Sequence, residues 1–335
     1  MKNRQSNFEL LRLVAIFMVL IVHADFLALD VPTKEVVNAN PFASFLRFFF
    51  QALSIVCVDV FVLISGWFGI RPSSKGFFNL LFQCAFFNCS IYIVMLLLGL
   101  TTLSAKGIAD CLLLTDTYWF VKAYMLLYIL APVINSFIEN SSTNHIRNVL
   151  LLFFVFQTIF GFISDGAVFF ENGYSTISFI GLYLLARYTK MNIDKLNSPP
   201  PPFYIFIYGI ISLIISTIAM VSTYFTGFQF QRLFTYTNPL VIVASLSLLL
   251  FFNRLQFTNK TVNWLAASAF SIYLFHSNSN IFLPYFVYTI KNIYISFNGV
   301  YCLFGLLFFL IIVSLVAMMI DKIRIAIWKL IINNK

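Results

Sequence analysis

The stretch NFELLRLVAIFMVLIVH, residues 7–23, is long and apolar enough to cross a membrane, yet it contains an arginine and a histidine. Ionisable side chains in the hydrocarbon core are costly and usually face an interior cavity, so they are candidates for a functional site. Arg12 and His23 are about three helical turns apart, which places them on nearly the same face, roughly 16 Å apart along the axis. The first helix is therefore predicted to carry two polar groups on one face.

The composition predicts an all-α integral membrane protein. The chain has 335 residues, of which 61% are hydrophobic and 10% are charged, whereas about 25% are charged in an ordinary soluble domain. Apolar runs separated by short polar breaks fill almost the whole sequence, so we expect one polytopic domain over 1–335 and no separate soluble domain. The net charge of +9 is spread over loops and implies no nucleic-acid partner. The five cysteines include no CxxC pair, so neither a disulfide framework nor a metal site is predicted.

Ten helices are predicted from the apolar runs. Their approximate ranges are 8–29, 44–69, 77–100, 118–138, 147–164, 174–189, 203–225, 235–252, 262–283 and 299–320. Placing both termini in the cytoplasm puts most of the 21 basic residues on the inner side, which is the bias expected of an inner (cytoplasmic) membrane protein. The proline run within 198–202 is expected to be a stiff, extended cytoplasmic connector that divides the bundle without making two domains.

The two ionisable residues of the first helix each allow two interpretations. His23 falls in the outer half of the membrane, where an imidazole can act as a general base or can simply be hydrogen-bonded to a neighbouring helix. Arg12 can extend to the cytoplasmic headgroups, or it can face inward and bind a phosphate-bearing ligand through its planar guanidinium. Glu9, one turn earlier, favours the second alternative because it can orient the guanidinium.

The predicted second helix contains the sequence CVDVFVLISGW, with a buried acid followed by a small polar pair. An unpaired carboxylate there would be costly, so Asp59 is expected to meet a cation or a hydrogen-bond donor. A structural salt bridge and a catalytic role are both open. Gly66, next to Ser65, is expected to permit close helix approach, or the pair can make room for a ligand.

Aromatic and basic residues near the outer side form a third group. Trp119, Lys122 and Tyr124 open the predicted fourth helix, where they can anchor the helix at the interface or form a platform for a sugar ring. Arg47 carries the same ambiguity. His276, near the outer end of the ninth predicted helix, ranks second to His23 as a candidate base.

Four segments together resemble the membrane acyltransferase-3 family, the polytopic enzymes that O-acetylate surface glycans and related acceptors. They are NFELLRLVAIFMVLIVH (7–23), VDVFVLISGWF (58–68), YWFVKAYMLLYILAPVIN (118–135) and SIYLFH (271–276). The segments occur in the order and spacing of the family, and the ten-helix layout covers the chain.

The resemblance implies that His23 is the catalytic histidine and that Arg12 lies on the acyl-CoA side. It places Asp59, Ser65 and Gly66 in a helix-2 motif, and the helix-4 and late-chain motifs take in Trp119, Tyr128, Pro132 and His276. Some relatives carry a second arginine three residues after the first, whereas this chain has Ala15 there. The resemblance therefore assigns no residue to that part of the donor site.

The expected function is O-acyl transfer, most simply of acetyl, from cytosolic acetyl-CoA to a hydroxyl of a surface or lipid-linked glycan. Acetyl-CoA would be a substrate, and no tightly bound cofactor is expected. The predicted roles are catalysis by His23 and Asp59, donor binding by Arg12, Glu9 and Ser65, and acceptor binding by Trp119, Lys122, Tyr124, His276 and Arg47. The alternative is a transporter or flippase of a lipid-linked sugar or small molecule, and a passive scaffold would leave the aligned groups of the first helix unexplained.

Overall fold

The computed structural model describes residues 5–164, 169–196 and 199–333, and these residues form helices and no β-strand. Eight helices in the described ranges are long and apolar enough to cross a membrane. They are Ser6–Leu27, Pro41–Phe68, Ser74–Leu97, Trp119–Asn140, Thr143–Ile163, Pro201–Thr226, Gln231–Arg254 and Gly299–Ile331. The predicted all-α polytopic class is confirmed. The segments expected at 174–189 and 262–283 are also helical, but as shorter helices, so the count of ten crossings stays a prediction.

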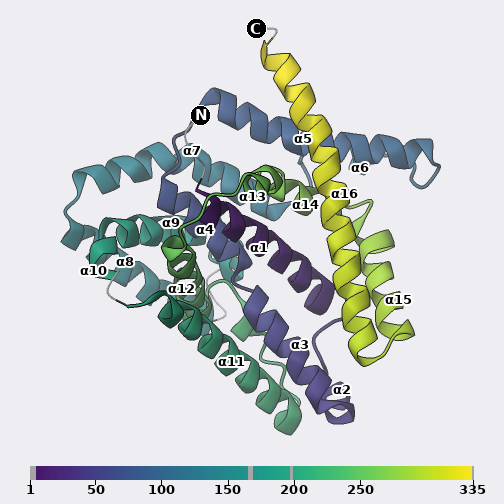
Figure 1. The fold of residues 1–335 in the computed structure, drawn as a ribbon, viewed down its shortest axis with the longest axis horizontal. Coiled ribbons are helices and arrows are strands. Elements are labelled where there is room, and N and C mark those ends of the chain that lie inside the picture. The colour runs from purple at the N-terminus through teal and green to yellow at the C-terminus, as the bar shows by residue number, and fades with distance from the viewer. Residues whose placement is uncertain (1–4, 165–168, 197–198, 334–335) are drawn as a thin grey trace. The chain divides into compact units, whose positions relative to one another are not determined.

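The described chain packs as two compact units, of which the first comprises Met1–Pro72 and Lys122–Asn259. In this unit α1, which carries Arg12 and leads into the turn that begins at His23, packs against α3, α4 and α12, and α11 runs beside α3 (Figure 1). Its α-helices are α1 (Ser6–Val22), α2 (Lys34–Ala39), α3 (Pro41–Ser54), α4 (Cys57–Phe68), α8 (Thr143–Gln157), α9 (Thr176–Met191), α10 (Ile193–Leu196), α11 (Pro201–Thr226) and α12 (Pro239–Arg254). Shorter π or 3₁₀ turns follow at η1 (His23–Leu27), η2 (Thr158–Ile163), η3 (Glu171–Gly173) and η4 (Gln231–Phe234).

The second unit comprises Ser73–Val121 and Lys260–Lys335. Here α16 packs against α5, α14 and α15. The elements are α5 (Ser74–Leu97), α6 (Ala105–Cys111), α13 (Lys260–Ala266), α14 (Ala269–His276), η5 (Phe282–Val287), α15 (Tyr288–Ser296) and α16 (Gly299–Asn333), and α7 (Trp119–Asn140) has its first residues here and the rest in the first unit. Each unit thus combines an early and a late part of the chain.

Helix ends follow from local sequence. The hydroxyl of Ser73 accepts the N–H of Gly76 and thereby satisfies a free donor in the first turn of α5. At the C-terminal end of α4, Gly69 adopts a positive φ of 73°, which glycine tolerates without strain. In the proline run, Pro200 is extended and Pro201 begins α11, because proline fits the first helical position. The predicted connector is therefore shorter than 198–202, and Ser198 lies outside the described residues.

The backbones of α4 and α9 approach closely at Gly66. A Cβ atom placed on Gly66 would lie 2.6 Å from the carbonyl oxygen of Tyr183 and 2.9 Å from Cβ of Ala186. No side chain fits between the two backbones, so the expectation of close helix approach at this glycine is confirmed. The same contact positions the end of α4 for the site described below.

Substitution of Gly66 by alanine is expected to destabilise the protein by about 1–3 kcal/mol, because the methyl group forces α4 and α9 apart. The measurement is thermal unfolding of the purified protein. Gly209→Ala is the matched control: a Cβ on Gly209 meets nothing within 4 Å, so removing the backbone freedom of a glycine within α11 should be neutral or stabilising. Equal stability of the two variants would contradict this account of the α4–α9 contact.

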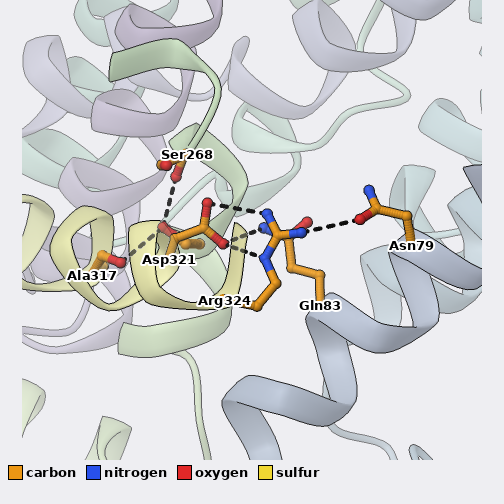
Figure 2. Close-up of polar contacts among 7 residues, drawn as sticks. Asn79, Gln83, Ser268, Ala317, Asp321 and Arg324 are labelled. Atoms are coloured by element: carbon orange, nitrogen blue, oxygen red, sulfur yellow. Dashed lines mark hydrogen bonds and ion pairs between the residues drawn. The ribbon is translucent and has the colours of Figure 1, made fainter. Parts of the chain in front are cut away.

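A buried ion pair joins α16 to α5 within the second unit (Figure 2). Arg324 contacts Asp321 through two nitrogens, with Nε 2.8 Å from Oδ1 and Nη2 3.2 Å from Oδ2. From α5, Gln83 donates to Asp321 Oδ1 at 3.1 Å, and Asn79 Oδ1 accepts from Arg324 Nη1 at 3.1 Å. The side chains of Asp321 and Arg324 are 0% and 5% exposed, respectively. Arg324 is therefore fully engaged inside the protein.

The end of α16 lies beyond the predicted range 299–320, since the helix continues to Asn333. The indole of Trp328 stacks on Phe82 of α5, with ring centres 5.1 Å apart. Closer to the start of α16, the carbonyl oxygen of Ala317 accepts from the hydroxyl of Ser271 on α14 at 3.1 Å, and that hydroxyl also donates to the carbonyl oxygen of Ser268 at 2.6 Å. The contact of Trp328 with Phe82 holds the extra turns of helix in place, and the apolar run alone did not reveal these turns.

Candidate active site

Arg12 and His23 lie along one unbroken helical stretch. α1 runs from Ser6 to Val22 and passes directly into the π turn that begins at His23. Arg12 Nη1 lies 2.6 Å from Glu9 Oε1, and these side chains are 34% and 7% exposed. The predicted contact of Glu9 with the guanidinium is thus present. The guanidinium carbon of Arg12 also lies 5.9 Å from the ring centre of Phe68, which holds it against the end of α4.

The segment after His23 is fixed by an ion pair with α3. Arg47 Nε and Nη2 each lie 2.6 Å from Asp25 Oδ1, and Nη2 also donates to the carbonyl oxygen of Asp30. Single π turns inside helices are often found at functional sites, and this one starts at the candidate base. The guanidinium of Arg47 is engaged here, while its predicted role in acceptor binding stays a prediction.

Substitution of Asp25 by asparagine is expected to lower the rate of acyl transfer by about tenfold or more, because the turn that orients His23 loses its ionic contact. Arg47→Gln removes the same contact from the other side and should have a similar effect. Initial rates at saturating acceptor measure both. If Arg47 acts only on the acceptor and does not position the turn, Arg47→Gln alone will raise the acceptor KM, and Asp25→Asn will match the wild type.

Ser65 and Tyr124 bring the second and third motif segments, 58–68 and 118–135, together. The hydroxyl of Ser65 lies 3.2 Å from the hydroxyl of Tyr124 and donates to the carbonyl oxygen of Phe61 at 3.0 Å. Tyr124 lies on α7, which also carries Trp119 and Lys122, and all three side chains are partly exposed. The contact joins one predicted donor-binding residue to one predicted acceptor-binding residue.

Asp59 is fully buried at the start of α4 and faces a serine. Its Oδ2 lies 3.5 Å from the hydroxyl of Ser245 on α12, and its Oδ1 has no hydrogen-bond partner among the described residues. Of the two expected kinds of partner, Asp59 meets a hydroxyl donor. No basic side chain of the described residues pairs with it, so the salt-bridge interpretation is wrong. The reason is local: the facing helix α12 presents Ser245 rather than a basic residue. The catalytic role of Asp59 stays a prediction.

Two further residues, which the sequence analysis did not single out, fix the turn after α4. The hydroxyl of Tyr183 donates to Asn135 Oδ1 at 2.8 Å and accepts the N–H of Ile70 at 2.9 Å. Asn135 Nδ2 in turn donates to the carbonyl oxygen of Ile70 at 2.8 Å. Asn135 ends the segment 118–135, and this polar residue after an apolar run was the available signal. The closed set of bonds holds the end of α4 beside α7 and α9.

His276 lies in the second unit and is fully buried. Its Nδ1 meets the carbonyl oxygen of Ile272, which can only accept, so Nδ1 donates. The hydroxyl of Ser277 lies 3.2 Å from Nε2 and can donate to it. Both ring nitrogens therefore have partners, and the predicted acceptor-binding role of His276 stays a prediction.

No metal centre is found among the residues that the structure describes, since no three His, Cys, Asp or Glu side chains lie together.

Comparison with known proteins gives one family. A family model described as an acyltransferase domain, of the acyltransferase-3 type, matches residues 5–320. No curated protein and no solved structure gives a match. The family match takes in both units and every candidate residue of the site.

Proposed function

Because the chain belongs to the acyltransferase-3 family, a family of membrane acyltransferases, we propose that it moves a short acyl group from cytosolic acyl-CoA to a glycan hydroxyl. Acetyl is the proposed group, and a surface or lipid-linked glycan is the proposed acceptor. The chain is a multi-pass membrane protein, and we place it in the cytoplasmic membrane with both termini inside. The observation that carries the proposal is the arrangement of α1, where Arg12 and His23 share one unbroken helix and Glu9 holds the guanidinium.

In the proposed reaction the imidazole of His23 takes the proton of the acceptor hydroxyl. The hydroxyl oxygen attacks the thioester carbonyl, so that a C–O bond forms as the C–S bond breaks. The proton held by His23 then passes to the departing sulfur, which leaves as the free thiol of CoA. The pantetheine arm is comparable in length to the roughly 16 Å between Arg12 and His23, so one donor can contact both residues.

The remaining candidate residues take supporting roles. Ser65 and Glu9 are proposed on the donor side, while Trp119, Lys122, Tyr124, Arg47 and His276 are proposed for the acceptor. Asp59 is proposed to support the imidazole of His23, because a carboxylate stabilises the positive charge that the ring gains with the proton. Asp59→Asn tests this role, because the amide keeps the size of the side chain but cannot carry a negative charge.

The experiment combines mass spectrometry of surface glycans with an assay for free CoA thiol. Cells or membranes that contain the protein should show glycans heavier by one acyl group, and they should release CoA from acetyl-CoA in step with that modification. Transport of an unchanged sugar without CoA release would contradict the proposal and favour an exporter or flippase. Loss of the mass difference on removal of the protein is required.

A further inference from the structure

Three cationic side chains gather around the end of α4 in the first unit. Arg12 of α1 and Lys190 of α9 both face the ring of Phe68, with the guanidinium carbon and the ammonium nitrogen 5.9 and 5.5 Å from its centre. Arg187, one turn before Lys190, lies against the following residue: its Nη1 would be 3.1 Å from a Cβ placed on Gly69. Residues from two helices, α1 and α9, thus form one cationic cluster at the end of α4, defined as Arg12, Arg187 and Lys190.

This cationic cluster is short of negative charge. Arg12 pairs with Glu9, whereas neither Arg187 nor Lys190 has a carboxylate partner in the described part of the chain. Lys190 donates only to the carbonyl oxygen of Trp67, at 2.8 Å, and Nε of Arg187 is buried with no partner among the residues described. Burial lowers the pKa of Lys190, and the neighbouring Arg187 lowers it further. An anion bound here would relieve both effects.

The type of anion follows from the side chains. A guanidinium binds phosphate oxygens in pairs, and an ammonium adds a compact charge that reaches a third oxygen. The ring of Phe68, which lies beside Lys190 and is 40% exposed, provides a flat surface of the kind on which a nucleotide base can stack. The cationic cluster also lies at the Arg12 end of α1, roughly 16 Å from His23.

We propose that Arg187 and Lys190, together with Arg12, bind the phosphate groups of the acyl-CoA donor, a role that rests on the function proposed above. The turn after α4 places this site: Gly69, at positive φ, allows the guanidinium of Arg187 to approach the backbone. A Cβ at that position would lie 3.1 Å from Nη1 and would crowd it. Acyl-group selection is left to residues nearer His23.

The test measures binding of CoA itself, which cannot react, to the full chain in nanodiscs of phosphatidylcholine. CoA, 3′-dephospho-CoA and pantetheine are compared by isothermal titration calorimetry. Each of Arg187→Gln and Lys190→Gln should weaken CoA binding about tenfold to a hundredfold. Pantetheine, which lacks the phosphates, should bind the variants and the wild type equally. Arg187→Lys should recover part of the lost affinity because it keeps the charge.

Arg147→Gln is the matched control, since Arg147 is an exposed cation on α8 outside the cationic cluster. It should bind CoA as the wild type does. Thermal unfolding identifies any variant that fails to fold, and if Arg187→Gln does so, Lys190→Gln still carries the test. A second set of nanodiscs with added phosphatidylglycerol separates the two phosphate sources. If the cationic cluster is a site for lipid headgroups, phosphatidylglycerol will weaken CoA binding by competition in the wild type only. In neutral nanodiscs, CoA binding will then not depend on the CoA phosphates.

Unchanged CoA affinity in both glutamine variants would overturn the assignment, and the proposed function would stand as long as the wild type still transfers acetyl from acetyl-CoA. Equal binding of CoA and pantetheine by the wild type would overturn it as well. If the wild type neither binds CoA nor releases it from acetyl-CoA, the proposed function itself fails, and the phosphate site fails with it.

Discussion

Replacement of His23 by alanine is expected to lower acyl transfer by roughly 10²–10⁴-fold, the usual contribution of a general base. The side chain lies where α1 passes into its π turn. The only basic residue within α1 itself is Arg12, whose guanidinium stays protonated. Free CoA thiol and glycan mass are the two measurements. Both should fall together, because hydroxyl attack and thioester cleavage belong to one step.

The control for this experiment is the amount and fold of the variant. His23→Ala should appear in the membrane at the wild-type level and should unfold at a similar temperature. It should also bind CoA normally, because the cationic cluster lies at the other end of α1. Normal glycan modification by a variant present at ordinary levels would remove His23 from the mechanism.

Replacement of Arg324 by methionine is expected to cost about 3–5 kcal/mol of unfolding free energy, because it leaves the buried carboxylate of Asp321 without its charge partner. Asn79 loses its donor at the same time, and only Gln83 still donates to the carboxylate. The apparent midpoint of thermal unfolding in detergent measures the loss. This is the largest stability effect expected in the second unit.

A double variant separates the ion pair from simple packing. Asp321→Leu combined with Arg324→Met removes both charges, and apolar residues of similar size often replace a buried pair at little cost. The double variant should therefore recover most of the stability that the single variant loses. A double variant as unstable as Arg324→Met would show that the charges themselves are not what the single substitution disturbs.

The membrane-spanning architecture could be predicted because hydrocarbon imposes a simple rule on the sequence: long apolar runs must be helices. The expected range 8–29 corresponds closely to Ser6–Leu27. The expected range 44–69 hides a break at Ile55 and Val56 that separates α3 from α4. Both halves are apolar, so periodicity gave no sign of the break.

The candidate site was predictable along one helix and not between helices. Arg12 and Glu9 are neighbours in sequence, so their contact follows from helical spacing alone. Arg187 and Lys190 lie near the end of the predicted segment 174–189, but nothing in the sequence says that α9 packs on α4. The same limit applies to Asp25 and Arg47, whose ion pair depends on how α3 folds back along α1.

The unbroken course of α1 also fixes the distance between the cationic cluster and His23. Its backbone hydrogen bonds fix the interval between the phosphate end and the base, and a helix neither stretches nor shortens by more than a small fraction of a turn. A thioester carried on a short thiol such as cysteamine is too short to contact both the cationic cluster and His23 at once. Substrate choice would then be set by reach as much as by charge, before the transferred group is recognised.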